Sequence, residues 1–337
     1  MTTKRLATLF LVASAAVFPV MAQTDASADS VGRESSAWKY IPKFHGVMRT
    51  YYEWSTATGK SRFEVNNARL NAGGYILPKA DYFLQVDFCN NGKITLLDAY
   101  ARLSPAEGLQ IYAGQCRVPF SVESSRAPEK YHFASVGLVA ELGNLRSVGV
   151  KAAYTIPKST VYLEGGIFNG TDRSDHTQWN SQLTYSIKAN WTYAGFRPEV
   201  AFMSRVPGGQ DDVRRFNQGN VSLSWTHGGF MIEGEYIRRE YTGSDASAEA
   251  WDVFADYGFD VDWKLAKRLS FQARYDGVTT ADIERKRITI GTTARYSCQN
   301  AFIDFRINYE QYFYSENAGK ISPSGNNKLV AGAVLYF

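Results

Sequence analysis

The side chains that could perform catalysis or bind a metal are few, and they match no established pattern. A nucleophilic site needs a serine or cysteine beside a histidine that a carboxylate orients. His132 lies near Glu129 in a stretch with several serines. The sequence has no nucleophile motif, phosphate-binding loop, dinucleotide-binding run or metal-spaced histidine pair to accompany it. We therefore expect no catalytic residues, no metal and no cofactor, and an enzyme is the less favoured alternative.

The second kind of chemistry that the sequence could support is electrostatic guidance of ions. The run 117–144 carries Arg117, Arg126 and Lys130, and it also holds Glu123, Glu129 and Glu141. In a narrow passage of low dielectric constant such charges act strongly on ions. The question is therefore which elements could place this run in a passage.

The first 22 residues predict export. Lys4 and Arg5 precede an apolar stretch at 6–18, and Val20-Met21-Ala22 fits the small-x-small cleavage rule. This pattern is typical of a cleaved secretory signal peptide, because the apolar stretch is shorter than a membrane-spanning helix needs. Residues 23–42 are polar and are predicted to form a short N-terminal segment without a core.

Residues 43–337 repeat segments of about ten residues in which apolar and polar side chains alternate. In 250–264 one face holds Trp251, Val253 and Tyr257, and the other holds Asp252 and Asp256. Alternation of period two predicts strands, and seven apolar residues on one strand face exceed what soluble strands of ~5–6 residues usually offer. No later apolar run could span a membrane as a helix, so a membrane location would require a closed barrel.

Counting these segments predicts sixteen strands. They lie near 43–54, 62–77, 80–89, 94–103, 108–116, 145–156, 160–169, 180–193, 196–205, 217–226, 229–241, 250–264, 268–277, 286–297, 301–314 and 327–337. Short and long connections alternate between them, with 90–93 as the exception, as expected for periplasmic turns and outer loops. The fold class is therefore all-β, a transmembrane antiparallel β-barrel in the bacterial outer membrane, in contact with its lipid.

Opposite the apolar faces, the polar faces should line the lumen. The basic residues that we assign to this lining are Arg49, Arg102, Lys151, Arg274, Arg295 and Arg306, and acidic residues nearly balance them. Formal net charge is only +4, which implies no broad basic surface for nucleic acid. Cys89, Cys116 and Cys298 are too scattered for a disulfide framework or a zinc site.

The connection 117–144 is by far the longest, and it is too apolar for a solvated loop. Phe120, Tyr131, Phe133 and Leu138 are among its apolar side chains. Connections beyond ~12–15 residues are usually functional or disordered. We expect this third outer loop to fold into the lumen, where Arg117, Arg126 and Lys130 would form the positive side of a constriction. A surface or subunit-contact loop is the alternative.

Three runs give the sequence a family resemblance. They are IYAGQCRVPFSVES at 111–124, NLRSVGVKAAY at 144–154 and YLEGGIFNGTDRSD at 162–175. As a set they resemble the phosphate-selective porin O and P family over about residues 40–337. The resemblance implies a sixteen-stranded, trimeric barrel with arginines that guide anions, and it assigns that role to Arg117, Arg146 and Arg69. The lysine ring of the family has no counterpart, since Lys130 stands alone in its loop.

These observations predict a general or weakly anion-preferring porin through which small hydrophilic solutes and ions diffuse passively; a preference for phosphate is what the resemblance implies. An adhesin or structural barrel with a closed lumen is the alternative from another class. A barrel enzyme is the third.

Overall fold

The computed structural model describes residues 40–90, 92–170, 179, 182–206, 215–264, 266–280, 283–298, 301–315 and 325–337. The expected signal peptide, all but the end of the polar segment at 23–42, and His176 lie outside the described residues. None of the helices among the described residues is long and apolar enough to cross a membrane.

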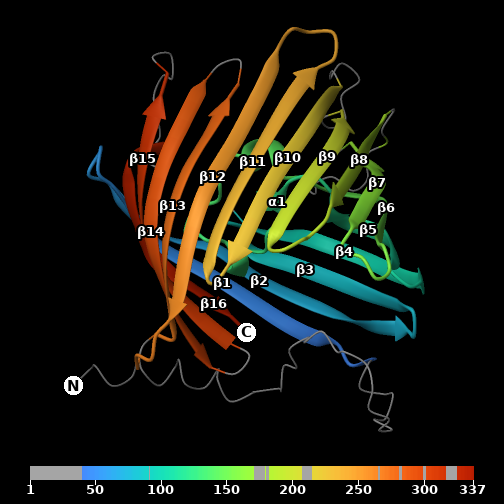
Figure 1. Ribbon diagram of the computed structural model, residues 1–337, viewed down its shortest axis with the longest axis horizontal. Coiled ribbons are helices and arrows are strands. Elements are labelled where there is room, and N and C mark those ends of the chain that lie inside the picture. Colours follow the sequence, from blue (N-terminus) through green and yellow to red (C-terminus); the bar gives the residue numbers. More distant parts are fainter. Residues whose placement is uncertain are drawn as a thin grey trace.

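Sixteen strands form one closed antiparallel barrel, as predicted (Figure 1). In chain order they are β1 Lys43–Ser55, β2 Ser61–Leu77, β3 Ala80–Asn90, β4 Lys93–Ala106, β5 Leu109–Arg117, β6 Arg146–Thr155, β7 Tyr162–Asn169, β8 Leu183–Asn190, β9 Phe196–Arg205, β10 Phe216–His227, β11 Phe230–Tyr241, β12 Ser247–Asp260, β13 Arg268–Thr279, β14 Glu284–Cys298, β15 Ala301–Tyr314 and β16 Lys328–Tyr336. Each strand pairs with its neighbours in sequence, and β1 closes the barrel against β16 with Val47 opposite Tyr336.

The predicted strands agree with the observed ones to within a few residues. The largest differences are at 180–193, where β8 covers Leu183–Asn190, and at 250–264, where β12 ends at Asp260. Val261 and Trp263 continue the alternation of β12, but their amides donate to Lys267 and Ala266 in a turn. The alternation of apolar and polar residues therefore continues beyond the last residue pair of β12 and β13.

The two faces of the barrel have opposite chemistry. Val253, Phe305 and Ile307 are exposed on the outer face, whereas Asp304 and Arg306, from the same strand as the latter two, are buried. A soluble protein would show the reverse, since buried charges are rare unless paired. An apolar exterior around a charged interior is the arrangement of an outer-membrane barrel.

The two ends of the barrel differ in their connections. Short turns join β2 to β3, β4 to β5 and β10 to β11 at one end, where β1 also begins and β16 ends and the Gly46 amide donates to the Phe337 carbonyl. We call it the short-turn end. The opposite, long-loop end carries the connection between β5 and β6, residues Val118–Leu145, which we call the β5–β6 segment.

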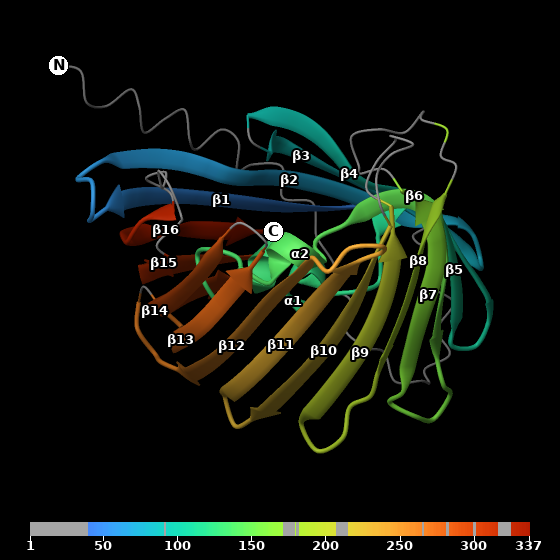
Figure 2. The ribbon, with the colours of Figure 1, turned by 90° about the horizontal axis from the view of Figure 1, so that it is seen from above.

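The β5–β6 segment contains three short helices, which are α1 (Val122–Ser125), the 3-10 helix η2 (Pro128–Lys130) and α2 (Ala140–Gly143). The Ser121 side chain caps α1 by accepting a hydrogen bond from the Ser124 amide at 3.1 Å. Seen along the barrel, α1 and α2 are drawn between the β1–β16 side and the β9–β12 side (Figure 2).

Candidate functional site

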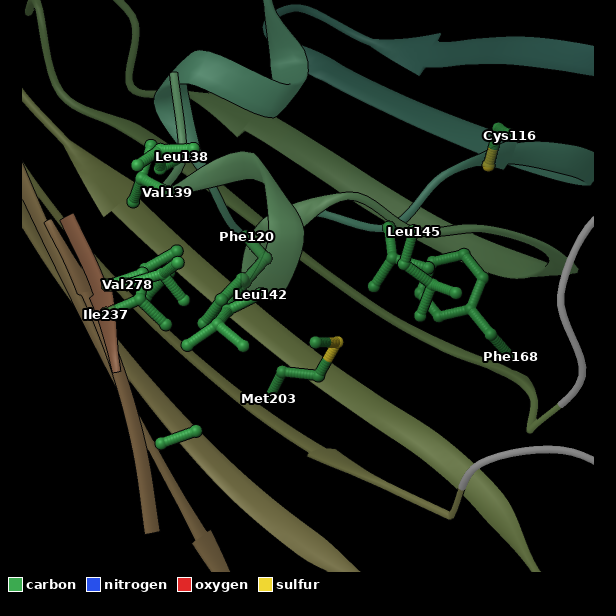
Figure 3. Packing of buried hydrophobic residues seen from close by; sticks show 14 residues of the cluster. Cys116, Phe120, Leu138, Val139, Leu142, Leu145, Phe168, Met203, Ile237 and Val278 are labelled. Atoms are coloured by element: carbon green, nitrogen blue, oxygen red, sulfur yellow. The ribbon is translucent and has the colours of Figure 1, made fainter. Parts of the chain in front are cut away.

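The β5–β6 segment packs its apolar side chains against buried residues of several strands. Phe120, Val139 and Leu142 are buried in one cluster with Ile237 of β11 and Val278 of β13, as Figure 3 shows. Burying a phenylalanine or leucine contributes roughly 1.5–3 kcal/mol. The apolar residues that looked out of place in an outer loop therefore have partners on the barrel.

The first helix of the segment is held by acidic side chains of β11. The Glu235 carboxylate accepts hydrogen bonds from the amides of Val122 and Glu123, both at 2.9 Å. Arg126 forms ion pairs with Glu123 and with Glu233, the latter at 2.6 Å. A carboxylate at the first turn of a helix accepts hydrogen bonds from amides that have no partner within the helix.

The charge state of Glu123 follows from these partners. Burial alone would raise its pKa, but Arg126, Arg274 and the Gly137 amide stabilise the carboxylate and hold the pKa below its ordinary value. For Arg126, the opposing carboxylates outweigh burial and raise the pKa. The pair is thus charged at neutral pH, and Arg126 is neutralised by its partners.

A cavity of about 500 Å³ lies at the long-loop end, and its lining is strongly basic. Its cationic lining residues are Arg49, Arg69, Arg117, Arg146, Arg285, Arg287 and Lys328. Its one acidic lining residue among those described is Glu141, which pairs with Arg285. We call this space the long-loop-end cavity.

Most cations of the long-loop-end cavity have a carboxylate behind them in the wall. Arg69 pairs with Asp87 at 2.9 Å, and Arg146 pairs with Asp98 at 3.0 Å. Neither aspartate lines the cavity. The wall therefore presents guanidinium donors to the space and keeps the negative groups away from it.

Arg117 differs from its neighbours. It stands at the end of β5 with Arg146 directly opposite on β6. Among the described residues its side chain forms no ion pair or hydrogen bond, and its electrostatic neighbours are Arg146, Tyr131, Asp98 and Arg69. Its charge is thus available to an anion in the cavity.

A second cavity, of about 950 Å³, lies at the short-turn end. Its lining mixes signs: the basic residues are Arg126, Lys130, Lys188, Arg197, Arg268, Arg295 and Arg306, and the acidic residues are Glu129, Glu199, Glu233, Asp256 and Asp304. Such a lining is polar but has little preference for either sign of ion. We call it the short-turn-end cavity.

Tyr131 of the β5–β6 segment lines both cavities. Its ring lies against the Arg49 guanidinium, 5.0 Å from the ring centroid. The neighbouring Lys130 and His132 face the short-turn-end cavity, whereas Ser135 and Val136 face the other. The β5–β6 segment therefore contributes residues to the lining of both cavities, and Tyr131 contributes to each.

The site residues that we proposed from the sequence fall into three groups in the structure. Arg49, Arg69, Arg117 and Arg146 meet around the long-loop-end cavity. The second group, at the short-turn-end cavity, consists of Arg126, Lys130, Arg295 and Arg306. The third group, Arg102, Lys151 and Arg274, lines neither cavity and forms ion pairs with Asp81, Glu164 and Asp276.

Sequence reasoning did not single out Arg285, Arg287 and Lys328 for the site. In the predicted strand 286–297, Arg287 falls on the polar face that should line the lumen, but no motif distinguishes it from other wall charges. Arg285 lay outside the predicted strand 286–297, and β14 begins at Glu284. Placing the strand start correctly would have put Arg285 on the same face as Arg287.

The groups that could have suggested catalysis or metal binding have other partners. His132 Nδ1 lies 2.6 Å from an Asp256 carboxylate oxygen, and no described serine bonds to the ring. The described residues contain no cluster of histidine, cysteine, aspartate and glutamate suited to a metal. Cys89 and Cys116 are both free thiols.

Comparison with known proteins agrees with this architecture. The family model for phosphate-selective porin O and P matches residues 46–215, half of the chain. No curated protein matches the chain in sequence.

Three solved structures illustrate the likeness in fold. The anion-selective porin from Comamonas acidovorans superposes with a TM-score of 0.65 at 12% identity, covering 88% of this chain and 99% of that one. The outer membrane channel DcaP of Acinetobacter baumannii gives 0.64 at 15%, covering 91% and 100%. OmpT of Vibrio cholerae in its trimer form gives 0.61 at 12%, covering 88% and 99%. With its closed barrel of sixteen strands, the chain belongs to the phosphate-selective porin O and P family and is an outer-membrane channel.

Proposed function

We propose that this porin is a passive channel that prefers anions, and that the long-loop-end cavity is where it selects them. The carrying observation is the lining of that cavity, which has seven cationic side chains and one carboxylate among the described residues. Anions that enter from the long-loop end meet guanidinium donors before they reach the mixed charges beyond Tyr131. Charged donors bind oxyanions and halides through short, strong hydrogen bonds.

Selection in this mechanism needs no chemistry on the solute. The cations raise the local concentration of anions, and the ions then move down their own gradient. Inorganic phosphate and chloride both satisfy the donor set, because guanidinium groups offer paired N–H donors to phosphate oxygens. We expect the protein to have no enzymatic activity and to need no cofactor.

The inward path of the β5–β6 segment is the second part of the proposal. Its apolar cluster with β11 and β13, and the acceptors that Glu235 supplies to α1, support a position across the passage. There it would narrow the route between the two cavities at Tyr131. A plugged, conductance-free barrel would be the outcome if the segment closed the route completely.

The remaining parts of the proposal concern export and assembly. We infer that a signal peptide ending at Ala22 is removed during export to the outer membrane, as the apolar stretch and the small residues before Gln23 favour. A homotrimer agrees with the trimer form described for the similar OmpT of Vibrio cholerae.

The test is the current through the purified mature protein in a planar bilayer under a KCl gradient. Conductance steps with a reversal potential displaced toward that of chloride would support the proposal. The current through these steps should decrease when phosphate is added. Steps with no displacement would leave a non-selective porin and refute anion selection. Folded protein without steps would refute the open channel and favour the adhesin or structural barrel.

A further inference from the structure

Four consecutive carbonyls of the β5–β6 segment each accept a hydrogen bond from an arginine of a different strand. Residues 133–136 belong to no helix or strand, and the chain bends at 132–135. The bonds run from Arg306 of β15 to Phe133 O at 3.2 Å, from Arg49 of β1 to Ala134 O at 2.5 Å, from Arg274 of β13 to Ser135 O at 3.1 Å and from Arg287 of β14 to Val136 O at 2.8 Å. We call Arg49, Arg274, Arg287 and Arg306 the wall arginines.

The amides of the same stretch are also held by the wall. Asn308 of β15 accepts from the Ala134 amide at 2.7 Å, and Asp276 of β13 accepts from the Leu138 amide at 2.8 Å. Between them, a side chain at Gly137 would come within 2.8 Å of an Asp252 carboxylate oxygen, so the chain passes close to β12. Carbonyls and amides of this stretch are therefore bonded to β1 and β13–β15.

The wall arginines have almost no surface left for an ion. Arg274 is 3% exposed, and Arg49, Arg287 and Arg306 are each 2% exposed, although the last three border a cavity. Other donors of these arginines face acceptors in the wall, whereas Arg306 Nε and Arg274 Nη2 have no hydrogen-bond partner among the described residues.

Those acceptors are mostly carboxylates. Arg306 pairs with Asp304 at 2.8 Å, and Arg287 pairs with Asp276 at 2.6 Å. Arg274 lies 3.3 Å from the same Asp276, and Arg49 donates to Asn67 at 2.8 Å. Each guanidinium therefore bridges the barrel wall and a carbonyl of the segment.

The chemistry of the guanidinium suits this bridging role. Arginine has five N–H donors in a rigid fork and cannot lose its proton in proteins. Buried carbonyls of an irregular stretch have no partner of their own and are costly to leave unpaired. One edge of the fork can satisfy such a carbonyl while the other edge binds a carboxylate.

We propose that the four wall arginines are positioning residues: they hold Phe133–Val136 against the barrel wall by its carbonyls and so set the width of the passage beside Tyr131. Their hydrogen bonds leave little surface for binding an anion directly, although Arg49 and Arg287 still add positive charge to the long-loop-end cavity. Arg117, which has no such bond among the described residues, has the opposite role. The inference builds on the proposed channel, because it assigns different functions to cations of the same lumen.

The experiment compares three variants in single-channel recordings. Arg306→Gln removes a wall arginine, Asn308→Ala removes a bond to the same stretch without changing charge, and Arg117→Gln removes a charge without touching the stretch. The readouts are the fraction of time spent in partly closed levels and the reversal potential in a KCl gradient. Loss of one bond from a charged donor should raise the partly closed fraction about tenfold, equivalent to about 1.4 kcal/mol.

We expect both Arg306→Gln and Asn308→Ala to produce frequent partial closures, whereas Arg117→Gln should conduct steadily and lose anion preference. A reversal potential in Arg306→Gln that shifts as far as in Arg117→Gln, with steady current and a silent Asn308→Ala, would overturn the inference. Folding of Arg306→Gln is checked by the heat-modifiable barrel band on an unboiled gel. If that band is missing, the inference is tested instead with Asn308→Ala, which should show partial closures, and Arg306→Lys, which should not, since a lysine can still donate to Phe133 O.

The result is separable from the test of the proposed function. Wild-type protein without conductance would refute the channel itself. If the wild type conducts and prefers anions, and both Asn308→Ala and Arg306→Gln give steady currents, only the positioning role is refuted.

Discussion

Replacing Arg117 by glutamine should remove most of the anion preference of the channel. Most other cations of the long-loop-end cavity are paired with carboxylates, as Arg69 is with Asp87 and Arg146 with Asp98. An ion in the cavity therefore interacts with these pairs as dipoles. Arg49 has no ion pair among the described residues, but it is only 2% exposed. Arg117 has no ion pair among the described residues, so its charge is less compensated than those of its neighbours.

The size of the effect follows from Coulomb's law. An ion passing about 4 Å from a unit charge in water gains or loses about 1 kcal/mol. At ~0.1 M salt the screening length is about 10 Å, which reduces this energy by about a third. Removing the charge destabilises chloride and stabilises potassium, so their permeability ratio should change by about 1.4 kcal/mol, which is about tenfold.

The assay is the reversal potential in a KCl gradient, with two matched controls. Arg117→Lys keeps the charge and should retain the preference. Arg238→Gln makes the same change in net charge on the outer face of β11, since Arg238 follows the inward-facing, buried Ile237. A reversal potential of Arg117→Gln equal to that of wild type, or equal shifts in Arg117→Gln and Arg238→Gln, would refute the reasoning.

Three further predictions concern salt, packing and acid. The anion preference should decline as KCl rises from about 0.01 to 1 M at a constant gradient ratio, because the screening length falls from about 30 to 3 Å; a preference that does not change would contradict an electrostatic origin. Phe120→Ala should lower the free energy of unfolding by about 3–5 kcal/mol, because Phe120 is fully buried, whereas Phe271→Ala, on the exposed face, should leave thermal unfolding in detergent nearly unchanged. The pKa of Glu123 lies below its ordinary value. Its ion pair with Arg126 therefore stabilises the segment at any pH above the ordinary pKa, and this stabilisation is lost as pH falls through the lowered pKa. Partial closures of the channel should increase on strong acidification, and Glu123→Gln should show them at neutral pH.

The barrel could be predicted almost completely from the sequence, because each strand carries its own signal. Alternation of period two assigns Asp252 and Val253 to opposite faces without any knowledge of their neighbours. Antiparallel pairing between consecutive strands then leaves one arrangement, and closure follows because no edge can face lipid. The errors occurred at the strand ends, as at Val261 and Trp263, where the pattern persisted but the ladder did not.

The site could be predicted only in part, because its geometry depends on contacts between distant residues. Arg126 and Arg117 look alike in sequence, since both are arginines in one apolar connection. Glu233, more than a hundred residues away, neutralises Arg126, while Arg117 has no ion-paired carboxylate among the described residues. Nothing local distinguishes them, and neither does periodicity, since the path of an irregular segment has no period.

The same limit explains why a count of lumen charges does not predict selectivity. Along the strands, acidic and basic residues nearly cancel, yet the long-loop-end cavity is basic because the signs are ordered along the radius of the barrel. Asp87 and Asp276 are fully buried behind the arginines that they pair with. Such a pair points its positive end into the cavity, and its influence falls off faster with distance than that of a single charge. Paired arginines can therefore act only on an ion in contact with them, whereas Arg117 acts out to the screening length. Arg117 should control which ions enter, and the wall arginines should control how wide a passage those ions find.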